Sequence, residues 1–300
     1  MDLSIIIVNY NTIELTKQTL HSIFDKKYNF IYEVFVVDNA STDGSVDMIK
    51  TEFPQVQLIE NNQNLGFSKA NNLAITLAEG KYILLLNSDT VVLEDCLSKS
   101  LSYLDAHPEI GVLGCQVILK NGQLDHACKR GFPTPEASLY YILKLNKLFP
   151  NSKRFGQYDL TYLSDQEVNQ VDAVTGAFMM VRRGVIDEVG GLDEDFFMYG
   201  EDLDWCYRIK KAGWKIIYYP EAKIIHYKGA SNKKKKVKIV YEFHRAMYLF
   251  YKKHYNEKYN AFVKGLVYMG IGIKLAISTV VNLFKKRGGH DDQGKPKDTK

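Results

Sequence analysis

The chain of 300 residues is 46% hydrophobic and 25% charged, the composition of a soluble globular protein with one large domain or two small ones. Its net charge of +4 is unevenly distributed, because residues 228–300 hold 18 Lys and Arg against five Asp and Glu. This segment therefore carries +13, and the first 227 residues carry −9. The asymmetry predicts an anionic partner for the basic segment. Four cysteines without metal-type spacing indicate free thiols in a reducing compartment rather than a cysteine metal site, and the N-terminus lacks the features of a signal peptide.

The first half of the chain alternates apolar runs with amphipathic stretches. Strands are predicted at Ser4–Val8, Val34–Val37, Val56–Ile59 and Tyr82–Leu86. Helices are predicted at Leu15–Phe24 and Ser68–Ala78, with a short helix capped by Thr42 or Asp43 between them. This alternation is typical of βαβ units in a largely parallel sheet, with the loops that follow the strands along one edge.

The middle of the chain is less regular. A strand is predicted at Ile110–Ile118, and residues 123–168 predict a long mobile region without a clear period. Further elements are predicted as a strand at Val171–Val181 interrupted by Gly176, a helix at 200–212 ended by Gly213, and two short strands, Trp214–Tyr219 and Lys223–His226, around Pro220.

The C-terminal region is helical in pattern and then polar. Gly265–Phe284 is mostly apolar and about 30 Å long as a helix. Lys274 in its middle would cost roughly 2.5–3.5 kcal/mol at a bilayer centre. Lys274, Ser278, Asn282 and Lys285 form one polar stripe, which favours a helix lying in a membrane interface over a spanning one. The alternative is a helix that docks on the domain or on a second copy.

Three predicted strands end in residues that can bind a ligand. Asp38 follows the second strand and could accept a hydrogen bond from a nucleotide base, although a helix cap explains it equally well. Asp89, in Asn87-Ser88-Asp89 after the fourth strand, could bind Mg²⁺ or Mn²⁺ beside a substrate phosphate, or serve as a turn and cap. His226 ends the last strand and suits Mn²⁺, although a lone histidine is more often structural.

Three carboxylates lie close together in the segment from Phe196 to Arg208. Glu201, Asp202 and Asp204 are flanked by aromatic residues, an environment in which a carboxylate can serve as a base. By itself the segment favours a helix N-terminus, where acidic residues complement the macrodipole, over a catalytic site.

In combination these segments resemble the inverting family 2 glycosyltransferases, which have the GT-A fold, an α/β fold with a Rossmann-like, mostly parallel sheet and a fused acceptor-binding half. The resemblance extends from the start to about residue 255. The sequences of the matching blocks are most similar to those of the branch of rhamnosyltransferases and galactofuranosyltransferases. The matching blocks are Ser4–Asn11, Val36–Ser45, Asn64–Asn72, Leu86–Thr90, Gly190–Asp204 and His226.

The resemblance implies a role for each matching residue. It implies a nucleotide-sugar site made by Val8, Asn9, Tyr10, Asn11, Asp38, Asn64, Gly66, Lys69, Asn87 and Ser88. Asp89 and His226 are the implied ligands of Mn²⁺ or Mg²⁺, and Asn87 replaces the first aspartate of the family's metal motif. Asp202 is the implied catalytic base with Glu201 beside it, and Gly176 and Asp204 are implied to bind the acceptor.

The function implied by the resemblance is metal-dependent, inverting transfer of a sugar from a nucleotide sugar to a hydroxyl of a glycan or lipid-linked glycan. The expected donor is dTDP-rhamnose, and the alternative is a UDP-hexose, UDP-N-acetylhexosamine or UDP-galactofuranose. We expect a catalytic domain at residues 1–255, an amphipathic membrane-associated helix at 256–287 and a disordered tail at 288–300. The basic tail predicts a cytoplasmic protein that is peripheral on an anionic membrane surface, without specifying an oligomeric state.

Two other classes of function compete with the enzyme. A basic-tailed protein that binds anionic surfaces would use Lys233–Lys236, but no nucleic-acid-binding motif accompanies this run, so we expect no nucleic-acid partner. A non-catalytic scaffold with the transferase fold is disfavoured because Asp38, Asp89, Asp202 and His226 are all present.

Overall fold

The computed structural model describes residues 1–228 and 236–287, and the predicted tail at 288–300 lies outside the described residues. Two compact units divide the chain, Met1–Ser231 and Asn232–Lys300. The catalytic domain at residues 1–255 and the membrane-associated helix at 256–287 stay predictions. Each unit is described by itself.

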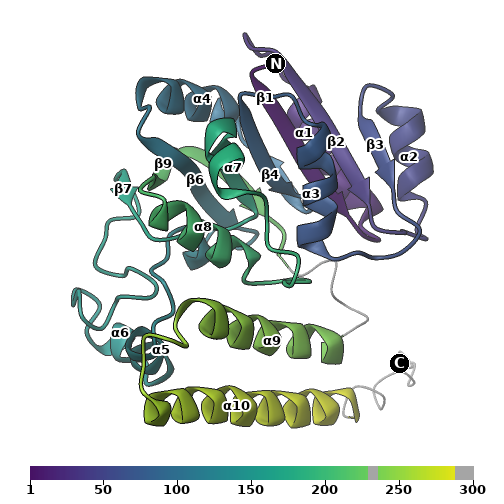
Figure 1. The fold of residues 1–300 in the computed structure, drawn as a ribbon. Helices are drawn as coiled ribbons and strands as arrows, with labels where there is room; N and C mark the ends of the chain where they lie inside the picture. The colour runs from purple at the N-terminus through teal and green to yellow at the C-terminus, as the bar shows by residue number, and fades with distance from the viewer. Residues whose placement is uncertain (229–235, 288–300) are drawn as a thin grey trace, which may run out of the picture. The chain divides into compact units, whose positions relative to one another are not determined.

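The first unit is an α/β domain built on a nine-stranded sheet (Figure 1). Its strands are β1 (Leu3–Asn9), β2 (Tyr32–Asp38), β3 (Gln57–Glu60), β4 (Tyr82–Asn87), β5 (Thr90–Val92), β6 (Ile110–Leu119), β7 (Asn169–Gln170), β8 (Phe178–Arg182) and β9 (Lys215–His226). Its α-helices are α1 (Ile13–Phe24), α2 (Ser45–Glu52), α3 (Phe67–Leu77), α4 (Cys96–Ala106), α5 (Pro135–Ile142), α6 (Leu145–Leu148), α7 (Arg183–Val189) and α8 (Glu201–Lys211).

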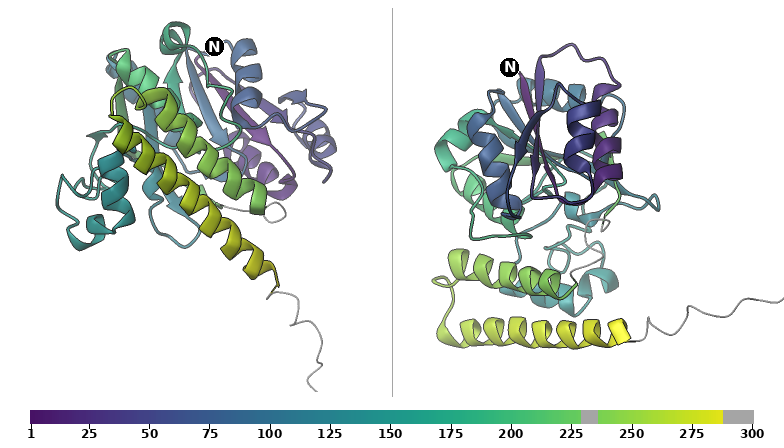
Figure 2. Two further views of the ribbon diagram at one scale, coloured as in Figure 1. Left: turned by 60° about the horizontal axis from the view of Figure 1, so that its bottom comes forward. Right: turned by 90° about the vertical axis from the view of Figure 1, so that its right-hand side faces the viewer.

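The strand order is β3-β2-β1-β4-β8-β6-β9-β5, with β7 paired to β9. Strands β3, β2, β1 and β4 are parallel, whereas β8 is antiparallel to both of its neighbours. The strand order reverses between β1 and β4, so α1 and α2 cover one face of the sheet and α3 the other (Figure 2). In open α/β sheets, ligands bind at such a reversal, beyond the carboxyl ends of the strands.

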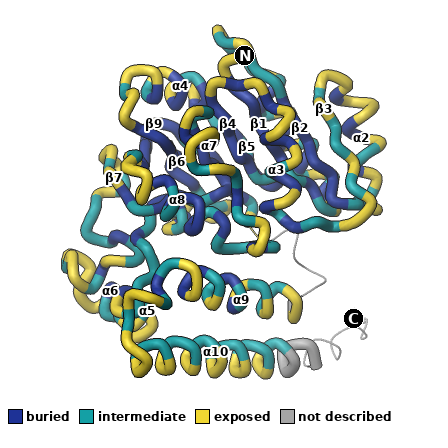
Figure 3. Tube along the Cα trace, in the orientation of Figure 1, coloured by how far each residue is buried: buried dark blue, intermediate teal, exposed yellow. Residues whose placement is uncertain are grey.

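The core is centred on β1, β2 and β4, which are apolar runs covered by helices on both faces. Ile5, Ile6, Ile7, Leu84 and Val36 have no more than 1% of their surface exposed, as the dark strands of Figure 3 show. Strands buried on both faces in this way are typical of a parallel sheet.

Several predicted elements differ from the structure. The two strands expected around Pro220 are one strand, β9, because its pairing with β6 shifts register between Tyr219 and Lys223 and so accommodates the proline. The strand expected at Val171–Val181 is reduced to β8, which begins after Gly176. The irregular region 123–168 contains two short helices, α5 and α6, and α5 begins at Pro135 after the N-cap Thr134.

The second unit is a pair of helices, α9 (Lys236–His254) and α10 (Ala261–Arg287). Tyr268 of α10 packs against Tyr248 and Tyr251 of α9, and its hydroxyl donates to Asn256 Oδ1 at 2.9 Å. One stretch of α10, Ala261–Asn282, is long and apolar enough to cross a membrane by length and composition alone.

Candidate active site

The loops after β1 and β2 are held together at the strand reversal. Asn9 and Asp38 lie side by side in the parallel register, and Asn9 Nδ2 donates to Asp38 Oδ2 at 2.6 Å. Asp38 Oδ1 accepts from the backbone of Ser41 at 2.8 Å, while Ser41 Oγ accepts from the backbone of Asn11 at 2.9 Å. Asp38 is only 2% exposed, so its carboxylate holds the two predicted nucleotide loops in one arrangement.

The loop that contains Asn64 and Gly66 is connected to the Asp38 loop by Asn39, which the sequence did not indicate as a site residue. Asn39 Nδ2 donates to the carbonyl of Gly66 at 3.1 Å, and its Oδ1 accepts from Asn61 at 3.0 Å. Asn64 Oδ1 in turn accepts from the backbone of Gly66 at 2.9 Å. The predicted residues Asn64 and Gly66 therefore lie beside the Asp38 loop, and Asn39 connects the two.

Gly66 is the point at which the nucleotide loops meet the segment before α8. Its φ of +87° is left-handed, and an added Cβ would lie 2.5 Å from the carbonyl oxygen of Phe197. The next residue, Phe67, donates its backbone N–H to that same oxygen at 2.7 Å, and Ser68 Oγ donates to the carbonyl of Phe196 at 2.7 Å. Only glycine fits here, because both the conformation and the close approach exclude a side chain.

The other predicted donor-site residues lie around these loops. Val8 is in register with Asn87 across β1 and β4, and Ser88 Oγ is 3.1 Å from Thr12 Oγ1. Tyr10 is partly exposed beside Asn9. Lys69 is half exposed on α3, with its Nζ 3.9 Å from Glu194 Oε2.

Asp89 and His226 are brought together by the pairing of β5 with β9. Thr90 is opposite His226 in the antiparallel register, and the backbone N–H of Tyr227 donates to the carbonyl of Asp89 at 2.8 Å. His226 Nε2 lies 3.1 Å from Asp89 Oδ1, and both side chains are less than 10% exposed. Two predicted metal ligands, 137 residues apart in the sequence, thus share one buried site.

Asp125 is a further acidic neighbour that the sequence did not indicate. Its Oδ2 lies 3.7 Å from His226 Nδ1 and accepts from Lys228 Nζ at 3.1 Å. Burial would lower the pKa of His226, but the nearby carboxylates of Asp125 and Asp89 raise it to about 9. Burial would raise the pKa of Asp125, but His226 and Lys228 hold it well below its usual range.

This cluster suits a divalent cation shared with a phosphate group. Among the described residues, no group of three or more His, Cys, Asp or Glu side chains could hold a metal by itself. Mg²⁺ and Mn²⁺ nevertheless often take only one or two protein ligands and complete their coordination with substrate phosphates. Asp89 and His226 provide two such ligands, and the buried His226 Nδ1, without a hydrogen-bond partner among the described residues, faces Asp125 as in a carboxylate–histidine–metal arrangement.

Asp202 lies in the first turn of α8, as predicted, and its carboxylate is held by three donors. Its Oδ2 accepts from Arg130 Nη2 at 2.5 Å and from the backbone of Gly176 at 3.2 Å. Its Oδ1 accepts from the backbone of Leu203 at 2.8 Å. A carboxylate oxygen has two lone pairs, so Oδ1 keeps one for a further donor such as a substrate hydroxyl.

Arg130 is the main functional candidate that sequence reasoning missed. It lies in the irregular region after β6, its side chain is 12% exposed, and its Nη2 also donates to the carbonyl of Val174 at 3.1 Å. Burial would lower the pKa of Arg130, but the Asp202 carboxylate raises it above its usual value. The guanidinium therefore stays charged beside the candidate base.

The register of β4 and β8 places Asp202 next to the metal motif. Asn87, at the end of β4, donates its backbone N–H to the carbonyl of Ala177 at 3.2 Å. The neighbouring residue, Gly176, donates its backbone N–H to Asp202, and a Cβ at Gly176 would also contact the ring of Phe67. The donor loops, the metal motif and the candidate base therefore meet around Gly176.

Glu201 is buried beside Asp202 and differs from it in its hydrogen bonds. Its side-chain Oε2 finds no hydrogen-bond partner among the described residues. Burial, reinforced by the adjacent charge of Asp202, raises the pKa of Glu201 to about 8. Glu201 is therefore mostly neutral at pH 7, while Asp202 has the hydrogen-bond donors of a carboxylate.

Asp204 lies inside the packing of α8, and its contact with an acceptor stays a prediction. Its side chain is fully buried, and Oδ2 accepts from Arg208 Nε at 2.8 Å. Arg208 also donates to the carbonyls of Val189 and Gly191. Asp204 thus anchors α8 on the turn that follows α7, since at the i+2 position of a helix its side chain points away from that of Asp202.

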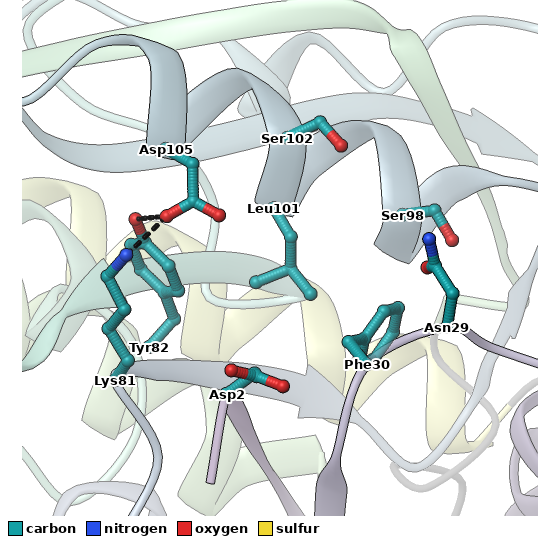
Figure 4. Close-up of a pocket in the computed structure, with 9 residues that line it drawn as sticks. All are labelled: Asp2, Asn29, Phe30, Lys81, Tyr82, Ser98, Leu101, Ser102 and Asp105. Carbon is teal, nitrogen blue, oxygen red and sulfur yellow. Dashed lines mark hydrogen bonds and ion pairs between the residues drawn. The ribbon is translucent and has the colours of Figure 1, made fainter.

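The cavity in Figure 4 lies at the opposite edge of the sheet, where β1 and β4 begin. Its volume is about 270 Å³, and the hydroxyl of Tyr82 and the ammonium of Lys81 both donate to Asp105 in its wall. The lining residues are Asp2, Asn29, Phe30, Lys81, Tyr82, Ser98, Leu101, Ser102 and Asp105. None of the predicted site residues lines it.

Comparison with known proteins identifies the family of the chain. The family model described as glycosyltransferase-like family 2 matches residues 2–239. The N-acetylglucosaminyl-diphospho-decaprenol L-rhamnosyltransferase of Mycobacterium tuberculosis is 27% identical over 228 residues, which cover 72% of this chain and 73% of that protein. The rhamnosyltransferase WbbL of Escherichia coli is 28% identical over 177 residues, covering 56% of this chain and 63% of WbbL.

A solved structure supports the fold. The mannosyltransferase PcManGT of Pyrobaculum calidifontis, in complex with GDP-Man and Mn²⁺, superposes with a TM-score of 0.59 at 18% identity, covering 96% of this chain and 76% of that one. The family model covers well over half of the chain and includes every predicted site residue. The chain is thus similar to rhamnosyltransferases, and it belongs to glycosyltransferase family 2 and is a transferase enzyme with the GT-A fold.

Proposed function

We propose that the protein transfers rhamnose, with inversion, from dTDP-rhamnose to a hydroxyl of a glycan or lipid-linked glycan in surface polysaccharide synthesis. The observation that carries the proposal is the way in which the carboxylate of Asp202 is hydrogen-bonded. Its carboxylate is oriented by Arg130 and Gly176, and one lone pair of Oδ1 remains for the acceptor. The rhamnosyltransferases among the relatives support the choice of sugar.

The donor would bind across the strand reversal. The loops held by Asn9, Asp38 and Asn39 would receive the nucleoside, and the diphosphate would extend toward Asp89 and His226. These two residues would hold Mn²⁺ or Mg²⁺, which when bound neutralises charge on the diphosphate leaving group. The Mn²⁺ in the PcManGT complex supports this choice of cation.

Asp202 would remove the proton from the acceptor hydroxyl as its oxygen attacks the anomeric carbon. Attack from the face opposite the diphosphate inverts the configuration, and the nucleoside diphosphate departs. Arg130 would keep the carboxylate in position, since a misplaced base loses most of its rate advantage. Glu201, protonated at neutral pH, would add no second negative charge beside the base.

The test is a screen of nucleotide sugars with the full-length protein in the presence of Mn²⁺. dTDP-rhamnose is expected to raise the melting temperature and to be slowly hydrolysed, ahead of UDP-galactofuranose, UDP-N-acetylglucosamine, UDP-glucose and GDP-mannose. Transfer to a lipid-linked acceptor should give a product whose anomeric configuration, read by NMR, is opposite to that of the donor. A preference for a UDP-sugar would overturn the choice of donor, and retained configuration would overturn the mechanism.

A further inference from the structure

The second unit has a surface feature that sugar transfer does not use. From Ala261 to Val281 of α10, every exposed residue is apolar or glycine. This apolar face of α10 consists of Ala261, Phe262, Gly265, Leu266, Met269, Gly270, Gly272, Ile273, Ala276, Ile277, Val280 and Val281. Its large side chains are from 46% exposed at Val281 to 74% exposed at Phe262.

The polar residues of the same helix segment are on its other side. Lys264, Tyr268, Lys274, Ser278, Thr279 and Asn282 are all less exposed than the members of the apolar face. Contacts with α9 orient this side, because the Tyr268 ring packs against Tyr248 and Lys274 Nζ lies 5.7 Å from the ring centre of Phe243. The side of α10 that holds Lys274, Ser278 and Asn282 is thus the less exposed one, and the apolar face is outward, as α10 in Figure 3 shows.

We propose that this apolar face inserts into the surface layer of an anionic lipid bilayer, with α10 lying parallel to the membrane plane. As a helix, Ala261–Asn282 is about 33 Å long, and its outward side offers no polar side chain to a protein partner. Soluble proteins rarely expose an apolar surface of this extent unless it marks an interaction site.

The basic residues near both ends of α10 favour an anionic membrane as the partner of the apolar face. Exposed Lys252, Lys253 and Lys258 precede α10, and the sequence Lys285-Lys286-Arg287 ends it. Basic residues at both ends of an apolar face match the headgroup layer of a leaflet that contains anionic lipids, where each is attracted to the surface. A spanning orientation would instead carry Lys264, Lys274 and Asn282 into hydrocarbon.

Vesicle flotation of the full-length protein tests the proposal without donor or acceptor, so its outcome is independent of the proposed sugar transfer. The wild type is expected to float with phosphatidylcholine vesicles that contain phosphatidylglycerol, and weakly with phosphatidylcholine alone. The double variant Ile273→Glu/Ile277→Glu is expected to lower the partition coefficient about 100-fold or more, because it places two charges in the inserted face. The matched control, Ile31→Glu/Leu77→Glu, changes two equally exposed apolar residues of the first unit and should float like the wild type.

The orientation of α10 is tested by single variants Phe262→Trp, Ile273→Trp and Val281→Trp with lipids that carry quenchers at known depths. A helix parallel to the membrane places all three at a similar shallow depth of about 5–10 Å, whereas a spanning helix places the middle one deepest. Spanning depths would overturn the proposed orientation. Flotation of the Ile273→Glu/Ile277→Glu variant equal to that of the wild type would overturn the proposal. The proposal would also be overturned if the wild type formed a dimer that does not bind vesicles and that the Ile273→Glu/Ile277→Glu variant dissociates.

Discussion

Replacement of Asp202 by Asn tests the assignment of the base most directly. The change is nearly isosteric and keeps an oxygen for Arg130, but it removes the negative charge and the ability to accept a proton. General-base catalysis typically contributes 10²–10⁴-fold, so we expect transfer to fall about 1,000-fold, or about 4 kcal/mol in the activation barrier. Binding of the nucleotide should persist.

The structure adds a cost in stability that must be separated from catalysis. Arg130 and Asp202 are 12% and 13% exposed, and loss of one charge leaves the other buried without its partner. We expect the free energy of unfolding to fall by about 3 kcal/mol in Asp202→Asn. A second change, Arg130→Met, removes the unpaired guanidinium and should recover most of this loss while transfer stays low.

A neighbouring carboxylate provides the matched control. Asp204→Asn also breaks an aspartate–arginine pair in α8, but away from the site, so it should lower stability while its turnover per folded molecule stays within a few-fold of the wild type. The measurements are urea unfolding, nucleotide release in the transfer reaction and nucleotide affinity by calorimetry. Turnover of Asp202→Asn within tenfold of the wild type, or recovery of turnover in the double variant, would refute the role of base.

Three further predictions address the loops, the acidic pair and the cation. Gly66→Ala should cost about 3 kcal/mol of stability, since it combines a left-handed φ with a clash on Phe197, whereas Gly122→Ala at φ +80° with open space should cost only about 1 kcal/mol in the same urea titration. Glu201 remains protonated up to about pH 8 in the folded state but ionises near its ordinary pKa when unfolded, so wild-type stability should decline from pH 5 to pH 8. Glu201→Gln should be about 3 kcal/mol more stable relative to the wild type at pH 8 than at pH 5, and an unchanged difference would contradict the raised pKa. EDTA should abolish transfer and Mn²⁺ or Mg²⁺ restore it, while Asp89→Ala should weaken Mn²⁺ binding followed by electron paramagnetic resonance; indifference to chelation would remove the metal from the mechanism.

The chain's local patterns determined the parallel half of the fold and most of the candidate site. Strands β1, β2 and β4 are apolar runs long enough to be buried on both faces, and each ends at a polar residue, Asn9, Asp38 or Asn87. Parallel pairing then brings these ends to one edge whatever the rest of the chain does. Asp202 was likewise predictable at the start of a helix, because Gly200 and the acidic first turn mark that start.

Only the tertiary structure decided how the remaining groups meet. Arg130 comes from a region without periodicity, and no local pattern shows that its guanidinium reaches Asp202, 72 residues further on. The roles of Glu201 and Asp204, on either side of Asp202, were also interchangeable in the sequence, and only the packing of α8 distinguishes them: Asp204 pairs with Arg208, whereas Glu201 Oε2 has no hydrogen-bond partner among the described residues. Likewise, the polar stripe of α10 was evident in the sequence, but only its contacts with α9 showed that the opposite face is the exposed one. Periodicity reports which side of an element is apolar, whereas the partner of a charge depends on contacts between distant segments.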